Sequence, residues 1–599
     1  MIYHCEDHTC NYWDEGEKLP ERCPQCGRKL LRANEADMTG DDWTALGNTL
    51  WDAEASDKKR MVDCFRKAAY LGSAWGVCNL GICMEQGNGV EADPVQAFWL
   101  YQQAVEMGSL NAVCCLGVCY QYGIGTAPDA KQAAELYCKA AEYGSPRGQM
   151  LLARAFHDGI GVEADAAEAV HWVRAAAYQR YGEGMYRLGV CYEYGDGVEQ
   201  NWEHAVHWFR EAAESGVSVA MADLGYCYEK GCGVEQSWEQ AFSWYRRGAE
   251  CGYPVSMSNL GLCYKRGYGV EQNWQEAIKW YEQGAQCGDL QSMHNLACCY
   301  ERGEGVEQNE DRALYWYRRS AEGGNGVAMC NLGWCYQRGY GVEQNEDRAL
   351  YWYRRGAEAG SVYCMFYLGW NYSNGVGVKQ NMTEAIRWYT AAAEGGNADA
   401  MHNLGWHYDH GEGVEQDMKK AICWYERAAE QNHPAAMNSL GECYAMGRGV
   451  PRDLETAMEW YRRAAELGEA MADYNMGWHL EQAGKLSEAY AHYRKAADGN
   501  DDSAWWALGR FYENGVVVAQ DGKEARRCYE TGEKLGSVKC KMRLARCKLL
   551  GIGGRREKKA GLDLCSQALE LAKESSEKED YGYEAEMNLL RRTIAENES

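Results

Sequence analysis

Four cysteines near the amino terminus have the residue type and spacing of a metal site: Cys5, Cys10, Cys23 and Cys26. Two residues separate Cys23 from Cys26, and Gly27 follows them, so both thiolates can reach one ion while the glycine frees backbone amides to face the sulfurs. Together the four cysteines supply the ligand set of a closed tetrahedral site. Such a site is structural, because it leaves no coordination position for a substrate.

Residues 1–33 resemble a rubredoxin-like zinc ribbon. They depart from that pattern in two places: four residues separate Cys5 from Cys10, and no glycine follows Cys10. We expect zinc rather than iron from the ligand type and the altered first pair, with His8 as an alternative ligand. The competing interpretation is four unrelated buried thiols. A metal is favoured because a segment this short has too little core to fold without one.

The rest of the chain consists of copies of a 36-residue repeat. Any other functional site must be positioned by the elements of this repeat. A leucine, usually followed by glycine, marks each copy: Leu80, Leu116, Leu152, Leu188, Leu224, Leu260, Leu296, Leu332, Leu368, Leu404, Leu440 and, as a variant, Met476. Less regular copies at Leu46, Leu508 and Leu544 bring the number to about 15. A repeat of this length predicts a solenoid in which neighbouring units share one core.

One copy shows what each repeat builds. Leu224, Gly225 and Tyr228 fall on one face of a helix. The sequence Gly-Cys-Gly-Val that follows breaks this helix, and Ser237 is placed to cap the next one. We therefore predict an all-α fold, an α/α superhelical solenoid of helix-turn-helix repeats.

These repeats resemble the Sel-1-like repeat family, relatives of the tetratricopeptide repeat. The resemblance rests on the Leu-Gly-x-x-Tyr helix, the Gly-x-Gly-Val turn and the Ala-x-x-Trp-Tyr helix. Departures are local, such as Ala153 and Ala297 in place of the glycine. We divide the chain into a zinc ribbon at 1–33, a solenoid at 34–554 and a charged helical cap at 555–599. The resemblance implies a scaffold or adaptor for protein partners.

The net charge of the chain narrows the classes of partner that it can bind. The chain carries 62 Lys and Arg against 88 Asp and Glu, a net charge of −26. This balance disfavours nucleic acid and anionic membrane, both of which attract basic surfaces. No apolar run is long enough to span a membrane, and no secretory signal is recognisable. We expect a cytoplasmic protein whose 28 cysteines are thiols or metal ligands.

Side chains opposite the predicted core face are the candidate partner-binding residues. Aromatic and basic residues recur there in successive repeats. They are Tyr226, Trp334, Trp370 and Trp406 two positions after the repeat leucine, Phe366 and His402 two before it, and Arg266, Arg302 and Arg338 six after it. In related helical solenoids, residues at such positions line a concave binding surface. The resemblance implies the same for the three sets of residues listed here. The opposing interpretation is that the aromatic rings pack on the next repeat and the arginines pair with nearby glutamates.

We predict a non-catalytic scaffold that binds a protein or an extended peptide, with acidic groups on the partner facing the arginines. Two alternatives stay open. One is a hydrolase of the β-lactamase type ascribed to some family members, for which Ser56 and Ser575 begin Ser-x-x-Lys matches without the companion motifs. The other is contact with nucleic acid through the zinc ribbon, against the acidic residues around Cys5 to Glu17.

Overall fold

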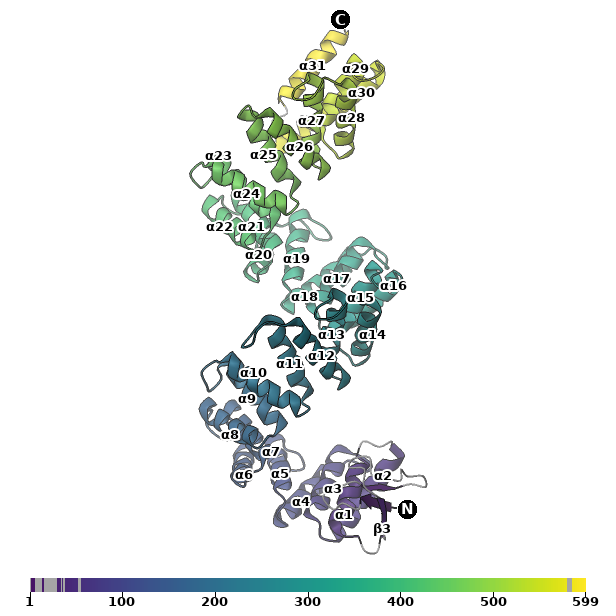
Figure 1. The fold of residues 1–599 in the computed structure, drawn as a ribbon, viewed down its shortest axis with the longest axis vertical. Helices are drawn as coiled ribbons and strands as arrows, with labels where there is room; N and C mark the ends of the chain where they lie inside the picture. Colours follow the sequence, from purple (N-terminus) through teal and green to yellow (C-terminus); the bar gives the residue numbers. More distant parts are fainter. Residues whose placement is uncertain are drawn as a thin grey trace. The chain divides into compact units, whose positions relative to one another are not determined.

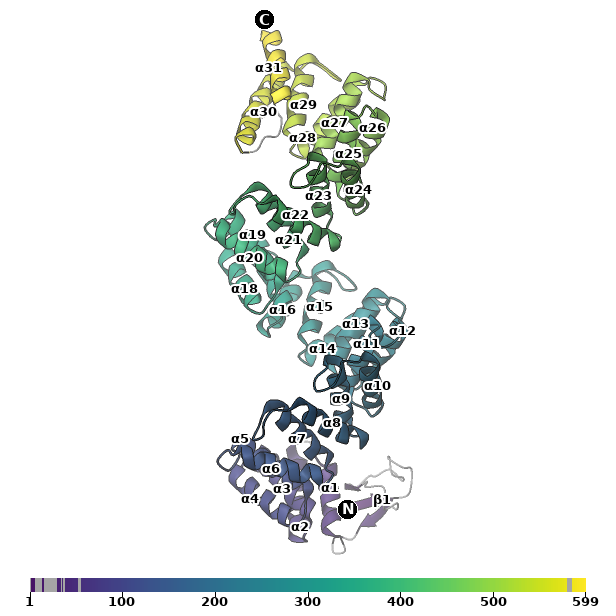
Figure 2. The ribbon, with the colours of Figure 1, turned by 90° about the vertical axis from the view of Figure 1, so that its left-hand side faces the viewer.

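The computed structural model describes residues 2–5, 13–15, 30–33, 35, 38–51, 55–578 and 584–598. The chain divides into two compact units, Met1–Gln308 and Asn309–Ser599, and each is described by itself. Figures 1 and 2 show that helices dominate both units.

Three short strands lie at the start of the first unit: β1 (Ile2–Cys5), β2 (Trp13–Glu15) and β3 (Leu30–Ala33). They form an antiparallel sheet in the order β2-β1-β3, with Tyr3 opposite Asp14 and Arg32. Of the predicted metal ligands, Cys10, Cys23 and Cys26 lie outside the described residues, and only the backbone of Cys5 is described.

The helices of the first unit are α1 (Gly40–Thr49), α2 (Ala55–Tyr70), α3 (Ala74–Gln86), α4 (Pro94–Glu106), α5 (Leu110–Tyr122), α6 (Ala130–Glu142), α7 (Pro146–Asp158), α8 (Ala166–Tyr178), α9 (Gly182–Tyr194), α10 (Trp202–Glu214), α11 (Ser218–Lys230), α12 (Trp238–Glu250), α13 (Pro254–Arg266), α14 (Trp274–Gln286) and α15 (Leu290–Arg302). From α3 onward they are uniformly 13 residues long. This regularity reflects the 36-residue period of the sequence.

The helices of the second unit are α16 (Glu310–Glu322), α17 (Gly326–Arg338), α18 (Glu346–Glu358), α19 (Val362–Asn374), α20 (Met382–Glu394), α21 (Ala398–His410), α22 (Met418–Glu430), α23 (Pro434–Met446), α24 (Leu454–Glu466), α25 (Ala470–Gln482), α26 (Leu486–Asp498), α27 (Asp502–Asn514), α28 (Gly522–Lys534), α29 (Val538–Leu550), α30 (Lys558–Lys578) and α31 (Glu584–Glu598). Within each unit an odd-numbered helix packs on the even-numbered helix after it, and the resulting hairpins stack in chain order. This stack of hairpins is the predicted all-α solenoid.

Backbone caps explain where the helices begin and end. In the copy that contains Leu224, the C-cap of α11 is Gly231. Its φ of 74° is left-handed, and its N–H donates to the carbonyl of Cys227. The Ser237 hydroxyl then accepts the N–H of Gln240 and starts α12, as predicted. Between them Gly233 is also left-handed, with φ 67°. Glycine adopts this conformation without the steric cost that other residues meet.

A buried aromatic residue of the second helix holds most of the hairpins together. Its ring lies against the repeat glycine of the first helix, so that a Cβ added at Gly261 would come 2.5 Å from the ring of Tyr281. The hydroxyl of this residue commonly donates to a side chain 16 residues earlier, as Tyr137 does to Gln121 at 2.7 Å. The series is Phe65, Tyr101, Tyr137, Phe209, Tyr245, Tyr281, Tyr317, Tyr353, Tyr389, Tyr425, Tyr461, Tyr493 and Tyr529, all at most 2% exposed.

Candidate functional site

A cavity of about 380 Å³ opens between the first helices of two neighbouring repeats in the second unit. Trp334 of α17 lies on one side of it, and Phe366 and Trp370 of α19 lie on the other. Arg338, the last residue of α17, adds a cation. Four of the nine residues predicted to bind a partner therefore line one cavity.

A chain of hydrogen bonds fixes the wall of this cavity. The Tyr353 hydroxyl of α18 donates to the side chain of Gln337 at 3.0 Å, and Gln337 donates to Asn371 of α19 at 2.7 Å. The ring of Tyr367 stacks on that of Tyr353, with centroids 5.2 Å apart. Three helices are tied together in this way, so the aromatic side chains above them are held on a rigid support.

The lining of the cavity carries one basic and one acidic side chain, so its electrostatic potential differs from one side to the other. Its charged lining residues are Arg338 and Glu346, the first residue of α18. Arg338 is exposed and makes no ion pair with any residue that the structure describes. The cavity can accept an apolar side chain between Trp334 and Trp370, with an acidic group beside Arg338 and away from Glu346.

Two predicted residues of the second unit are partly covered by other histidines. Trp406 stacks on His410 of its own helix, with centroids 4.3 Å apart. His402 stacks on His433 of the next repeat at 5.2 Å. Burial, together with the nearby His433, lowers the pKa of His402 to about 4. Both rings are half-buried, and neither lines the cavity.

The remaining predicted residues lie in the first unit. Tyr226 is 45% exposed, with Lys230 over its ring. Arg266 is exposed and has no ion pair among the described residues, whereas Arg302 lies 4.0 Å from Glu304. These three side chains share the outward positions that the sequence predicts.

The cysteines that recur three residues after the repeat leucine are mostly buried. Burial raises the pKa of Cys83 to about 11 and that of Cys263 to about 12. Thiols with such pKa values stay protonated at neutral pH, so they behave as small apolar core residues rather than as nucleophiles or metal ligands.

A second, larger cavity, in the first unit, was not predicted from the sequence. It measures about 770 Å³ and lies between α7 and α9, over α8. The signal that marks it is a double change in one repeat: Ala153 replaces the repeat glycine, and Val173 replaces the buried aromatic residue. Both changes are visible in the sequence, but they predict a cavity only when they are considered together.

Comparison with protein families gives one answer for almost the whole solenoid. The model described as Sel1 repeat matches residues 76–109, 112–145, 146–181, 182–217, 218–253, 254–289, 290–325, 326–361, 362–397, 398–433, 434–469, 470–501 and 504–537. The chain belongs to the Sel1 repeat family. The expected membership is confirmed, and each matched copy that lies within one unit contains one helical hairpin.

The chain is also similar to solved structures. A protective antigen of uropathogenic Escherichia coli is 32% identical and is aligned over 75% of this chain and 97% of its own, with a TM-score of 0.51. A Sel1 repeat protein from Oxalobacter formigenes is 33% identical over 41% of this chain and 96% of its own, with a TM-score of 0.38. A comparison with curated proteins gave no match.

Sel1 repeat proteins are commonly protein-interaction scaffolds, and this is the function class that the family implies. Among the residues that the structure describes, no cluster of three or more Asp, Glu, His or Cys side chains is placed to hold a metal. In the same part of the chain, no helix combines the length and apolarity needed to cross a bilayer.

Proposed function

We propose that this Sel1 repeat protein is a non-catalytic scaffold that binds an extended peptide segment of a protein partner through the first helices of its repeats. The cavity between Trp334 and Trp370 is the observation that carries this proposal. A partner places an apolar side chain in the cavity and an acidic neighbour beside Arg338. Glu346 repels an acid on its own side and so sets the direction of the bound segment.

The rigidity of the cavity makes this mode of binding efficient. The hydrogen bonds through Gln337 order the cavity wall before a partner arrives, so little conformational entropy remains to be lost on binding. Tryptophans that are partly exposed and set in a cavity are the side chains that contribute most to binding energy at protein interfaces.

The tryptophans test the proposal directly. A peptide selected against the full chain from a random library should be rich in Asp and Glu next to an apolar residue. Replacing Trp334 and Trp370 together with alanine should weaken its binding by about 100-fold, because each tryptophan supplies on the order of 1–2 kcal/mol. Fluorescence polarisation with the labelled peptide measures this loss.

Trp388 provides the matched control, because it belongs to the second helix α20 and does not line the cavity. The Trp388→Ala variant should bind the peptide as the unchanged protein does. A double variant that keeps its affinity refutes the cavity as the binding site. A double variant whose melting temperature collapses shows instead that the two rings belong to the core.

Within the part of the chain that the structure describes, no observation favours either alternative. The side chains of Ser56 and Ser575, on which the hydrolase alternative depends, lie outside the described ones. Retention on nucleic acid would have to overcome a net charge of −26.

We also propose that Cys5, Cys10, Cys23 and Cys26 hold one structural zinc ion. The donor set of four thiolates supports zinc. The antiparallel strands β1, β2 and β3 support a small β-module around it, because Cys5 ends β1 while the other three cysteines fall between or after strands of the same sheet.

Metal analysis tests this site. The purified full chain should contain one zinc ion per molecule, and replacing Cys23 and Cys26 with serine should remove it, since two ligands cannot retain the ion. Replacing the exposed solenoid thiols Cys251 and Cys287 with serine is the matched control and should leave the zinc content unchanged. Iron, or no metal, in the unchanged protein would contradict the assignment.

A further inference from the structure

The repeat at 146–181 lacks the side chain that fills every neighbouring hairpin. Between Phe65 and Tyr529, the second helix of every other copy carries a buried aromatic residue at this position, whereas this copy carries Val173. A valine leaves unfilled the space that a ring occupies elsewhere. The opposing Ala153 adds only a methyl group. The sequence combines an alanine and a tyrosine at the same two positions in another copy, as Ala297 and Tyr317, and Tyr317 is fully buried.

The empty ring position continues into the larger cavity. Val173, Ala169 and Val170 of α8 line its floor together with Ala153 of α7. The cavity then opens to the surface of the first helices, where α7 and α9 face each other. Its volume of about 770 Å³ is within the range of ligand pockets in proteins.

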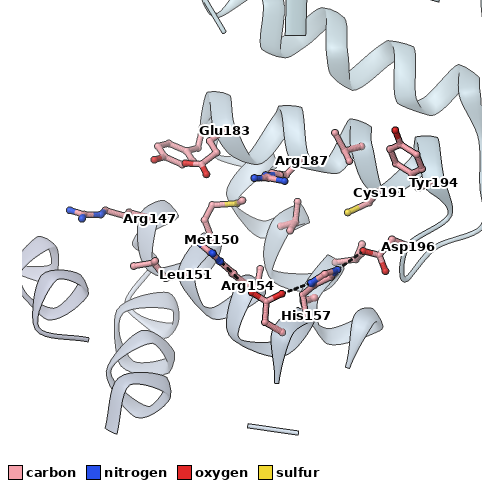
Figure 3. Close-up of a pocket in the computed structure, with 17 residues that line it drawn as sticks. Arg147, Met150, Leu151, Arg154, His157, Glu183, Arg187, Cys191, Tyr194 and Asp196 are labelled. Carbon is pink, nitrogen blue, oxygen red and sulfur yellow. Dashed lines mark hydrogen bonds and ion pairs between the residues drawn. The ribbon is translucent and has the colours of Figure 1, made fainter. Parts of the chain in front are cut away.

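Two acidic residues and a histidine occupy the polar end of the ring position. His157 is 16 residues before Val173, the place from which other repeats accept the tyrosine hydroxyl. Its Nδ1 lies 2.7 Å from Asp158, and its Nε2 lies 3.2 Å from Asp196 (Figure 3). The hydrogen bond to Asp158, with Asp196 nearby, raises the pKa of His157. The carboxylate oxygens of these two residues are acceptors for a hydroxyl group.

One cation in the lining lacks a partner. Arg147 hydrogen-bonds to Asn111 at 2.6 Å, and Arg154 pairs with Asp158 at 3.3 Å. Arg187 of α9 makes no hydrogen bond or ion pair with any described residue. Figure 3 shows it across the cavity from Met150, Arg154 and His157.

The lining carries three arginines and three carboxylates, Asp158, Glu183 and Asp196. Asp158 pairs with Arg154 and also contacts His157, and Asp196 contacts His157. Arg187 is the arginine of the lining that has no such contact with a described residue, and it corresponds to one anionic group on a ligand.

We propose that this cavity is a binding site for an aromatic ring that carries one anionic group, with a phenol as the preferred ring. The ring takes the position of the missing tyrosine against Ala153 and Val173. Its hydroxyl donates to the carboxylates around His157, and its anionic group pairs with Arg187. This site lies in the first unit and does not depend on the proposed peptide-binding function.

Calorimetric titration of the full chain tests the proposal with two probes. The first is 3-(4-hydroxyphenyl)propionate, which joins a phenol to a carboxylate. The second is the acetylated and amidated tripeptide Ala-Tyr-Asp, which presents the same groups from a polypeptide. Saturable binding of the first supports a small-molecule ligand, and binding of the tripeptide alone supports a protein segment. Binding of neither probe overturns the proposal.

Three variants locate the site. Val173→Tyr refills the ring position from within, with the same alanine and tyrosine residue types that the sequence has at Ala297 and Tyr317, and should weaken binding at least tenfold. Arg187→Gln should weaken it about tenfold by removing the cation. Phe209→Tyr is the matched control, because the next repeat is already filled, and should leave affinity unchanged.

Circular dichroism melting separates occupancy from misfolding. A Val173→Tyr protein that melts at or above the temperature of the unchanged protein shows that the tyrosine fits the empty position. If that variant instead fails to fold, Arg187→Gln decides the question, because this exposed side chain is not part of the core. Undiminished binding by the folded variants would overturn the proposal.

Discussion

Replacing Gly269 with alanine is expected to destabilise the hairpins around it by about 3 kcal/mol. Gly269 has a φ of 67°, which costs an alanine about 1 kcal/mol. The new Cβ would also overlap the backbone carbonyl of Trp238, the first residue of α12 in the preceding hairpin. Displacing packed backbone costs roughly 1–3 kcal/mol more. The second glycine of the Gly-x-Gly turn is thus a point at which the backbones of adjacent repeats are in close contact.

Hydrogen exchange at the amides of α12, α13 and α14 measures this loss as a lower free energy of local opening. Gly252→Ala is the matched control: Gly252 has a φ of 82°, but nothing lies within 4 Å of an added Cβ. The difference between the two variants isolates the steric contact from the backbone conformation. Equal destabilisation by both substitutions would show that adjacent hairpins do not meet at Gly269.

The fold was predictable because each repeat encodes its own boundaries. Asn201, Asn273, Asn345 and Asp453 cap second helices as the predicted Ser237 does, and the Gly-x-Gly turns are left-handed at both glycines. Local signals of this kind are independent of the rest of the chain, so their repetition strengthens the prediction.

The details of the candidate sites were less predictable, because they depend on contacts between repeats. A helical projection places Trp406 and His402 opposite the core, but it omits His410 and His433, whose rings cover them. The same projection places Trp334 and Trp370 on that face, but the cavity between them appears only when α17 and α19 are set side by side.

The larger cavity, between α7 and α9, shows a different limit of prediction from sequence: the residue change was visible, but the cavity that results from it was not. Its cause, Val173 in a series of aromatic residues, is visible in the sequence as a single departure. What makes it a cavity is that α7 and α9 leave the vacated space open to the helix surface. A departure from a repeat pattern is therefore worth testing as a binding site when the lost side chain is large and its replacement is small.

Removing the carboxylate of Glu586 is expected to release α31 from the end of the solenoid. Glu586 is buried and accepts two hydrogen bonds from the Arg543 guanidinium of α29, at 2.6 and 2.7 Å. It also accepts the indole N–H of Trp506 in α27 at 3.2 Å. Without this carboxylate, Arg543 stays buried with only the shared Glu513 to balance it. Breaking a buried pair costs about 3 kcal/mol.

Hydrogen exchange in α30 and α31 of the Glu586→Ala variant should therefore rise about 100-fold, the factor that about 3 kcal/mol corresponds to. The exposed Glu584 begins the same helix, and Glu584→Ala is the matched control that leaves exchange unchanged. Unchanged protection in Glu586→Ala would mean that apolar contacts such as Leu590 anchor α31 without the ion pair. Because α31 packs on α29, release of α31 would also uncover α29, so exchange in α29 should increase with that in α31. Joint loss of protection in the two helices is what distinguishes a charge-paired attachment from a purely apolar one.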